Sequence, residues 1–504
     1  MQIQCKGVLK LISFIKTKKC TMPLRLFCNL EQEINNSAIT APVRQFDKKR
    51  PGKPLFIPGM GAGEWRRLGN AAGIFSPLDM GVSPRIWGNK RIKGGKHMKK
   101  KLLALLLALC MVFALAACGS GGGDDAADDT GGDSSGGTIT IGMIAPMTGT
   151  NAAYGNSMLE GLQMTIDEIN EAGGILGMQV ELDYRDDQGD ATQAQNAFNA
   201  LIAEGVTLII GSATSGATSA LTSLANEEGV VLITPSATAD DITTEDDYIF
   251  RACFKDTLQG GIAAAYVDQQ GITRVGTIAC SADTYSQGLV DAFALACEER
   301  GIEVVEQQST ATMNAQDFTN QFTAMVNADV ELVYAVYYYD AVGPFLITQA
   351  RSAGYDGIIM GADGYDGALD YVSEGVDYSA FNNVVYTNHY DATDSSEVVQ
   401  NYVTSYGERY GTTPLCFAAL ASDCMMMLQT AMETAGTAEA SAVRDALADT
   451  SVTYEGVTGT FTLDETGTPV KGAAVISFAY DESVGGLEGL GTELVTTISA
   501  DEIA

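Results

Sequence analysis

The chain has 504 residues, more than one ordinary domain holds, so its length predicts two or more lobes. The formal net charge is −33, but residues 1–101 hold 21 of the 30 Lys and Arg residues, which leaves nine against 58 acidic side chains over residues 102–504. Such an acidic surface repels nucleic acids and anionic lipids, and the composition therefore excludes both as binding partners.

The composition changes at Met98, where a secretory signal is predicted. Three lysines follow it, and then an apolar run over residues 102–117. The run is shorter than the ~20 residues that span a bilayer, and it ends in small residues, as secretory signals do. Its end, LAAC at 115–118, resembles a bacterial lipobox, in which the cysteine is acylated and becomes the mature N-terminus. We expect a signal peptide over 98–117 and a lipid on Cys118; a simple membrane anchor is the alternative.

The segments on either side of this signal lack the patterns of folded structure. Residues 1–97 show no sustained helical or strand period, and a secretory signal normally stands near the N-terminus. Our hypothesis is an over-extended gene start with Met98 as the initiator; a disordered basic leader is the alternative. Residues 118–137 contain Gly, Ser and Asp without a large apolar side chain, which predicts a flexible tether.

From Thr138 onward, short apolar or alternating runs take turns with segments of helical spacing. Strands are expected over 138–146, 180–184, 208–210, 230–233, 274–279, 302–306, 332–337 and 357–360. Helices are expected over 156–171, 190–204, 217–228, 286–300, 317–327 and 343–354. A repeated strand–helix rhythm with few long loops predicts an α/β fold with two doubly wound parallel sheets.

Two polar turns follow the strands expected over 208–210 and 230–233. They read GSATSG at 211–216 and TPSAT at 234–238. Open α/β sheets bind ligands at the carboxyl ends of their strands, where both turns are expected. Ser215 stands just before the next helix, so its hydroxyl can cap that helix while nearby N–H groups face an anion. Ordinary turn chemistry is the alternative.

Nine segments of the folded part have a recognisable order and spacing. They read PMTGTNAAYG (146–155), AGGILG (172–177), DDQGDATQA (186–194), IIGSATSGATSA (209–220), ITPSATADDIT (233–243), FRACFKDTLQG (250–260), DTYSQGL (283–289), VYYYDAVGPFL (336–346) and IMGADG (359–364). Together they resemble the substrate-binding lipoproteins of branched-chain amino-acid ABC importers, over Thr138 to about Phe478. The resemblance implies a type I periplasmic-binding fold, with two doubly wound lobes joined by about three crossing segments. Lobe one would comprise 138–256 and 388–458, and lobe two 257–387 and 459–504.

The resemblance implies a monomeric receptor, anchored outside the cell membrane, that binds a small amino acid between its lobes. A branched-chain aliphatic amino acid is the expected ligand, and ABC permease subunits with cytoplasmic ATPases are the expected partners. Ser215 matches the family serine on the ligand carboxylate. Ser236 and Thr238 match positions that hold the ligand through backbone groups and a hydroxyl.

The resemblance also assigns a carboxylate to the ligand ammonium, which needs one when it is held away from water. Asp363 stands where the family often has Glu, and its shorter side chain implies a bridging water or a different ligand pose. Asp256, in the first crossing segment, is a weaker candidate that could instead position the hinge. Tyr154, Tyr285 and Tyr338 match the pocket tyrosines, whereas Tyr337 and Tyr339 are expected in the core or on the surface. A family disulfide is absent, because its positions hold Gly189 and Thr214.

The competing function classes lack their sequence signals. His389 is the one histidine of residues 102–504 and falls in a crossing segment, and no GxSxG elbow, HExxH or phosphate-binding loop stands in the strand and helix context that such motifs need. No enzyme is therefore predicted, although catalysis by carboxylates alone stays formally open. The acidic pairs at 186–187, 240–241 and 246–247 are expected on the solvated surface or in the first turn of a helix. Five cysteines without CxxC spacing predict neither metal nor cofactor, and are expected as buried hydrophobes with at most one or two disulfides: Cys253, Cys280, Cys297, Cys416 and Cys424.

Alternative ligands are an amide, urea or an aromatic acid. The alternative to a role in transport is a role in sensing.

Overall fold

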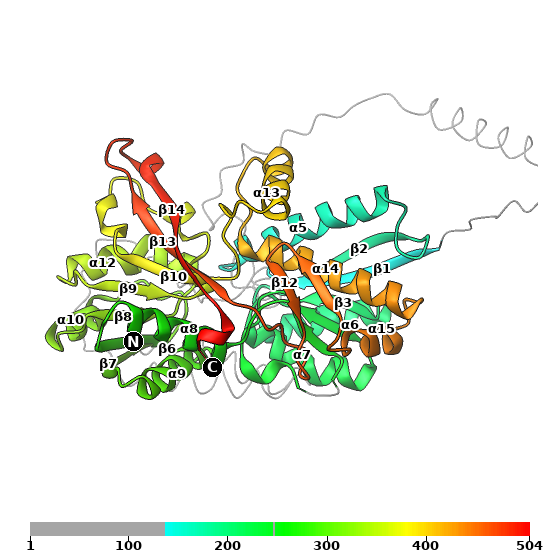
Figure 1. Ribbon diagram of the computed structural model, residues 1–504, viewed down its shortest axis with the longest axis horizontal. Helices are drawn as coiled ribbons and strands as arrows, with labels where there is room; N and C mark the ends of the chain where they lie inside the picture. Colours follow the sequence, from blue (N-terminus) through cyan, green and yellow to red (C-terminus); the bar gives the residue numbers. More distant parts are fainter. Residues whose placement is uncertain (1–136, 245–246, 504) are drawn as a thin grey trace, which may run out of the picture. The chain divides into compact units, whose positions relative to one another are not determined.

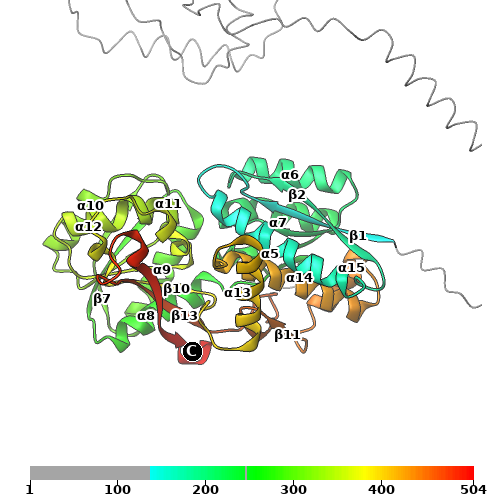
Figure 2. The ribbon, with the colours of Figure 1, turned by 90° about the horizontal axis from the view of Figure 1, so that it is seen from above.

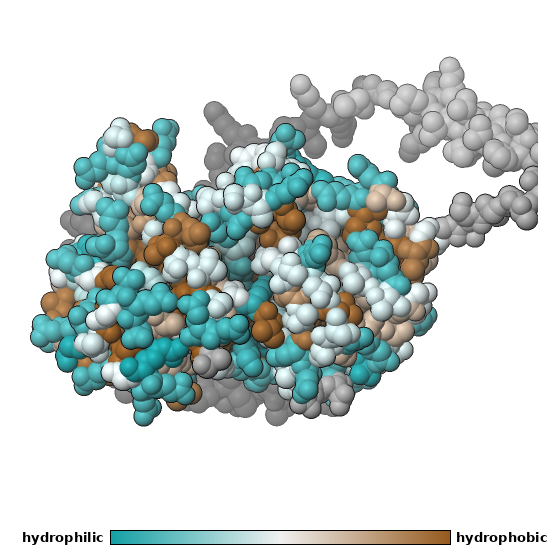
Figure 3. Space-filling model, viewed as in Figure 1, coloured by the Kyte–Doolittle hydropathy of each residue, from teal (hydrophilic) through white to brown (hydrophobic). Residues whose placement is uncertain are grey.

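The computed structural model describes residues 137–244 and 247–503, which belong to one compact unit (Figure 1). The expected signal peptide, Cys118 and most of the tether lie outside the described residues, as do residues 1–97. Within the described ranges, no helix is both long and apolar enough to cross a bilayer. On the face drawn in Figure 3, apolar residues form small patches separated by hydrophilic ones.

The first sheet has the strand order β2-β1-β3-β4-β5, and all its pairs are parallel, as predicted. Its strands are β1 (Thr138–Ala145), β2 (Gln179–Asp186), β3 (Leu208–Gly211), β4 (Val231–Thr234) and β5 (Ile249–Arg251). Every residue of β3 and β4 is buried, because helices cover both faces of the sheet. Successive residues therefore enter different cores: Ile210 packs with α5 (Ala152–Glu171) and α14 (Cys416–Ala435), whereas Ile209 packs with α6 (Ala191–Ala203) and α7 (Ser215–Glu228).

The second sheet repeats this strand order and then extends it. Its order is β14-β13-β10-β9-β8-β6-β7, in which β7-β6-β8-β9-β10 is parallel and matches β2-β1-β3-β4-β5. These strands are β6 (Arg274–Cys280), β7 (Glu303–Thr310), β8 (Leu332–Ala335), β9 (Ile358–Gly361) and β10 (Val384–Asn388). The prediction of two doubly wound sheets is therefore confirmed.

Two antiparallel strands at the edge of the second sheet were not predicted. They are β13 (Ala473–Tyr480) and β14 (Leu490–Ile498), the orange and red hairpin of Figure 1. A short connection can only join antiparallel neighbours, and here it contains Gly485 and Gly486, both at positive φ. The second sheet is thus mixed, with a parallel part that carries the loops described below.

Helices flank the second sheet in the predicted rhythm, with one irregular stretch. They are α8 (Asp256–Gln269), α9 (Thr284–Glu299), α10 (Thr319–Asn327), α11 (Tyr339–Ala341) and α12 (Ile347–Ser352). A π-helical segment, Val342–Leu346, joins α11 to α12. It contains Pro344, which has no N–H for a regular helical hydrogen bond and so disturbs the ladder. The expected helix over 343–354 therefore starts earlier, and the strand before it ends at Ala335, so Tyr337 and Tyr338 lie in the connecting loop.

The chain passes between the two sheets three times, as the fold class predicts (Figures 1 and 2). The passages lie between β5 and α8, between β10 and α13 (Glu397–Tyr410), and between β12 (Gly459–Thr462) and β13. Before the last passage, α15 (Ala440–Leu447) and β11 (Thr453–Gly456) pack on α14, which itself packs on α5 of the first sheet. The lobe boundaries at 256/257, 387/388 and 458/459 stay a prediction.

Candidate functional site

Each sheet has one point at which its strand order reverses, and such points form crevices for ligands in open α/β sheets. They lie between β1 and β3 in the first sheet and between β6 and β8 in the second. Tyr154 and Ser215 follow β1 and β3, whereas Tyr285 and Tyr338 follow β6 and β8. Four of the predicted residues therefore occupy equivalent places in the two sheets.

A small cavity lies between residues contributed by both sheets. Its volume is about 10 Å³, room for about one water molecule. It is lined by Tyr154, Ala213, Thr214, Ser215, Ser236, Tyr285, Tyr338, Asp363, Gly364 and Phe417. Six of the eight predicted ligand-binding residues are in this set. The other two, Thr238 and Asp256, are buried but do not line the cavity.

Hydrogen bonds at and near this cavity join the loops of one sheet to those of the other. The Tyr154 hydroxyl donates to the Gly364 carbonyl (2.7 Å) and accepts from the Tyr339 N–H (3.3 Å). The Tyr339 hydroxyl donates to the Thr150 carbonyl (2.5 Å) and accepts from the Ala153 N–H (3.1 Å). Tyr339 is buried, and sequence reasoning missed its role as a link between the two groups of loops.

The two polar turns of the first sheet are bonded to each other. The Ser236 hydroxyl donates to the Ala213 carbonyl (2.8 Å), and the Ser215 hydroxyl accepts from the Ala239 N–H (3.3 Å). Helix α7 begins at Ser215 itself, and the residue before it, Thr214, makes no side-chain cap. The prediction that Ser215 caps this helix is wrong, because its side chain is taken by the neighbouring turn.

Two buried charged residues anchor these turns, and sequence reasoning missed both. The Asp187 carboxylate accepts from the Ser212 hydroxyl of the first turn, so its expected place on the solvated surface is wrong. Arg251, at the end of β5, donates to three successive carbonyls of the second turn: Ala237 (3.3 Å), Thr238 (2.9 Å) and Ala239 (2.9 Å). A lone arginine in an apolar strand was a usable signal, because a buried guanidinium must find acceptors.

Asp363 is the centre of the polar part of the cavity. It is 2 % exposed, and its Oδ1 accepts from the Tyr285 hydroxyl (2.9 Å) and the Gln259 side-chain amide (3.0 Å). The imidazole Nε2 of His389 lies 3.7 Å from its Oδ2, too far for a hydrogen bond. Burial lowers the pKa of His389 against the opposing effect of Asp363, so the imidazole is neutral at pH 7. Among the described residues, the Asp363 carboxylate thus faces no fixed cation.

Several buried polar atoms around Asp363 have no hydrogen-bond partner. They are Thr238 Oγ1, Asp256 Oδ1, Gln259 Oε1 and both ring nitrogens of His389. Burial raises the pKa of Asp256 well above its usual range, and the nearby Thr238 hydroxyl opposes this only in part. Buried groups without partners are costly, and their concentration here points to a place where a polar ligand completes the bonding.

Aromatic rings form the remaining walls. Tyr154 stacks on Phe417 with a centroid separation of 3.9 Å, and Tyr285 stacks on Tyr338 at 5.3 Å. Tyr338 also meets the ring of Tyr154 edge-on at 5.7 Å. Phe417 was missed because it opens the long apolar helix α14, where nothing in the local pattern separates it from core residues. These rings surround the carboxylate with apolar surface.

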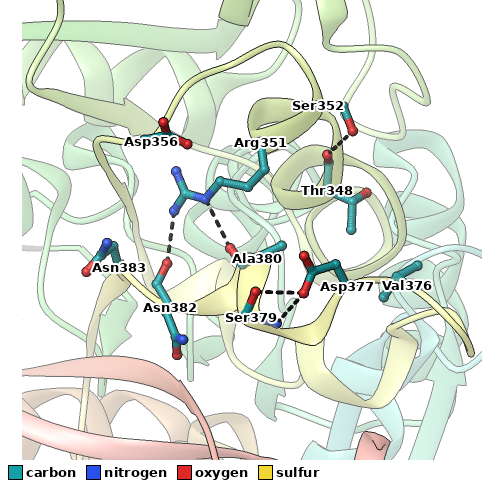
Figure 4. Close-up of a pocket in the computed structure, with 10 residues that line it drawn as sticks. All are labelled: Thr348, Arg351, Ser352, Asp356, Val376, Asp377, Ser379, Ala380, Asn382 and Asn383. Atoms are coloured by element: carbon teal, nitrogen blue, oxygen red, sulfur yellow. Dashed lines mark hydrogen bonds between the residues drawn. The ribbon is translucent and has the colours of Figure 1, made fainter. Parts of the chain in front are cut away.

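A much larger cavity lies elsewhere, and none of the predicted residues line it. Its volume is about 620 Å³, and it surrounds Arg351 (Figure 4). The guanidinium already donates to four carbonyls, those of Tyr355 (2.8 Å), Gly357 (2.9 Å), Asn382 (3.0 Å) and Ala380 (3.1 Å). These bonds use four of the five N–H donors of Arg351 and leave one for an anion, so this cavity is a weaker candidate than the small one.

The described residues contain no group of three or more side chains placed to hold a metal ion. All five cysteines within them are buried and free, so the small-hydrophobe interpretation holds and no disulfide joins them. Burial raises the pKa of the Cys253 thiol to about 12, which leaves it protonated and unreactive at neutral pH.

Comparison with known families agrees with the geometry. Residues 138–481 match the family model described as periplasmic binding protein. The chain belongs to this family. A Leu/Ile/Val-binding protein homolog of Brucella melitensis is 31% identical over 334 residues, which cover 65% of this chain and 88% of the relative. The Leu/Ile/Val-binding protein BraC3 of Rhizobium johnstonii is 33% identical over 313 residues, or 62% and 83% of the two chains.

Solved structures of periplasmic binding proteins share the fold. A leucine-binding protein LivK from Thermotoga maritima has a TM-score of 0.65 and 28% identity, and covers 72% of this chain and 99% of its own. The substrate-binding protein LivJ from Streptococcus pneumoniae, in complex with isoleucine, has a TM-score of 0.63 and 30% identity, with 71% and 99% covered. This periplasmic binding protein is thus of the Leu/Ile/Val-binding type, in a family of substrate receptors.

Proposed function

We propose that this protein is an extracytoplasmic, lipid-anchored, monomeric receptor that binds a branched-chain aliphatic amino acid between its lobes and delivers it to an ABC permease. The observation that carries the proposal is the buried Asp363 carboxylate, which faces no fixed cation and stands among unpartnered polar atoms. A ligand ammonium would supply the missing charge, since a buried carboxylate is stable only when it is paired.

The other two parts of an amino acid have matching surroundings. The ligand carboxylate would face the two turns, where the hydroxyls of Ser215 and Thr238 and nearby N–H groups can donate, while the Ser236 hydroxyl donates to the Ala213 carbonyl and holds the turns together. The aliphatic side chain would lie against the rings of Tyr154, Tyr285, Tyr338 and Phe417. Asp256 would hold the second turn in place, since its N–H donates to the Thr238 carbonyl (2.8 Å).

Binding would require the two groups of loops to separate. An amino acid needs far more room than the 10 Å³ of the cavity. Entry would therefore break the bonds from Tyr154 to Gly364 and from Tyr339 to Thr150, and closure over the ligand would restore them. The relatives named for Leu, Ile and Val binding, and the isoleucine complex of LivJ, support an aliphatic ligand.

The location and the partner rest on the sequence. The predicted signal over 98–117 and the lipobox-like LAAC support a lipid on Cys118, and the family resemblance supports an ABC permease with its ATPases. Mass measurement of the native protein should find an acylated N-terminal Cys118. A native protein that begins at Met1 without lipid would overturn this part.

Isothermal titration of the purified protein against amino acids, amides, urea and aromatic acids tests the ligand. We expect binding of Leu, Ile or Val with one site per chain. Heat with an amide or an aromatic acid, and none with Leu, Ile or Val, would overturn the ligand assignment.

A further inference from the structure

A second and larger cavity adjoins the ligand cavity. Its volume is about 240 Å³, and it shares Thr214 and Tyr338 with the ligand cavity as lining residues. The two cavities therefore lie on either side of Thr214 and Tyr338, and a ligand side chain that extends past these two residues would reach the second. This gives room for side chains longer than those of Leu, Ile and Val.

The lining of this second cavity is polar and carries negative charge. Asp283 and Asp340 come from the second sheet's loops, and Asn151, Gln188 and Asn314 are among the other lining residues. Neither cavity has a Lys or Arg in its lining. Asp363 lines the first cavity, so three acidic residues line the two cavities together, whereas an aliphatic amino acid brings a single cation.

The carboxylates of Asp283 and Asp340 differ in their hydrogen bonding within the fold. Asp283 caps helix α9, since its side chain accepts from the Ser286 N–H (2.9 Å). Asp340 stands at the start of α11, and its Oδ1 is inaccessible to water and has no hydrogen-bond partner. Burial raises the pKa of both groups, that of Asp340 to about 6, because no cation offsets the loss of hydration. A ligand cation would stabilise both in their charged form.

We propose that this receptor accepts a second class of ligand: amino acids whose side chain ends in an amine or a guanidinium, with that group beside Asp340 and Asp283. The inference rests on the proposed function, because it uses Asp363 and the two turns to hold the α-ammonium and α-carboxylate. The basic end group would replace the missing cation of the second cavity. The carbon chain would lie between Tyr338 and Thr214.

A purely structural role of Asp340 makes a different prediction. An acidic residue in the first turn of a helix stabilises that turn through the helix dipole. If this were its only role, its replacement would change stability and would affect the binding of all ligands alike. Selective loss of basic ligands separates the two cases.

Isothermal titration of the whole purified protein with lysine, arginine, norleucine and leucine tests the proposal. Norleucine is the control ligand, since it has a linear side chain like lysine without the amine. We expect lysine or arginine to bind, and Asp340→Asn to weaken that binding by about tenfold or more while leucine affinity stays within about twofold. Asp283→Asn keeps a capping side chain and should weaken lysine binding in the same direction.

The outcomes separate this inference from the proposed function. Leucine binding without lysine or arginine binding would overturn the inference and leave the proposed function standing. Equal weakening of leucine and lysine by Asp340→Asn, with a lower melting temperature, would overturn it in favour of the structural role. No binding of any amino acid by a folded protein would overturn both.

Discussion

The small cavity around Asp363 and the large cavity around Arg351 are opposites in their use of polar groups. Around Asp363, five buried polar atoms lack partners, and the carboxylate faces no fixed cation. In the large cavity, the Arg351 guanidinium donates hydrogen bonds to four backbone carbonyls. The small cavity has about 10 Å³ and the large one about 620 Å³. Buried polar groups without partners, and not cavity volume, therefore distinguish the proposed binding site of this protein.

The same substitution in each cavity gives the strongest test of this comparison. Asp363→Asn removes the charge partner of the ligand ammonium and should weaken amino-acid binding by about 3 kcal/mol, more than a hundredfold in Kd. Asp377→Asn is the matched control in the large cavity, where Asp377 is exposed and bonds only to Ser379. Titration of leucine into both variants measures the effect. Equal affinities would place the ligand away from Asp363.

Removal of the Arg351 guanidinium should have the opposite pattern of effects: a loss of stability without a loss of ligand affinity. Arg351→Met leaves four carbonyls without their donor and should lower the free energy of unfolding by about 2 kcal/mol. Ligand affinity should stay unchanged, because Arg351 serves the fold. Denaturant unfolding and titration are compared on the same variant. Loss of ligand affinity without loss of stability would make the large cavity the binding site.

A smaller effect is expected for the buried hydroxyl of Thr238. Thr238→Val keeps the shape of the side chain and removes a hydroxyl that lies near Asp256 and has no hydrogen-bond partner, so stability should change less than ligand affinity. Ligand affinity should fall by about 1.5 kcal/mol, roughly tenfold in Kd. Ser352→Ala, in the large cavity, is the control, since the Ser352 hydroxyl bonds to the Thr348 carbonyl. Unchanged leucine affinity in Thr238→Val would remove this hydroxyl from the site.

The smallest effect is a pH dependence at the second cavity. Burial raises the pKa of Asp340 from 3.8 to about 6, so the folded state binds more protons than the unfolded state between these values. The ligand-free protein should therefore lose stability as the pH rises from about 4 to 6. In Asp340→Asn this loss should be smaller, as measured by the melting temperature across that range. Parallel curves for both proteins would contradict the assignment.

Much of the fold could be predicted because its signals are local. The apolar run at 208–210 lies in β3 and that at 230–233, apart from Val230, lies in β4; residues of the polar turns after them line the cavity. The matched motifs also singled out Tyr338 within three consecutive tyrosines. The antiparallel hairpin of β13 and β14 was not predicted, because the alternation of strands and helices does not indicate strands that are added after the third passage between the sheets.

The missed parts of the site depend on partners far away in the sequence. The bond from Gln259 to Asp363 spans 104 residues, and that from Tyr339 to Thr150 spans 189. Phe417 meets Tyr154 only because α14 returns to pack on α5. The helix cap predicted for Ser215 was wrong because its hydroxyl bonds to the Ala239 N–H, just after the second turn and 24 residues away in the sequence. Local spacing predicts which residue types stand at strand ends, but tertiary packing decides which atoms they bond.

The hydrogen bonds from Arg251 to three successive carbonyls affect the entropy of ligand binding. A loop that must order itself when a ligand arrives loses conformational entropy, and this cost is subtracted from the affinity. The second turn is already fixed by the guanidinium and by the Asp256 N–H, so little of that entropy is left to lose. If the second turn holds the ligand as proposed, Arg251 would strengthen binding without contacting it, and its replacement would give a less favourable entropy of binding.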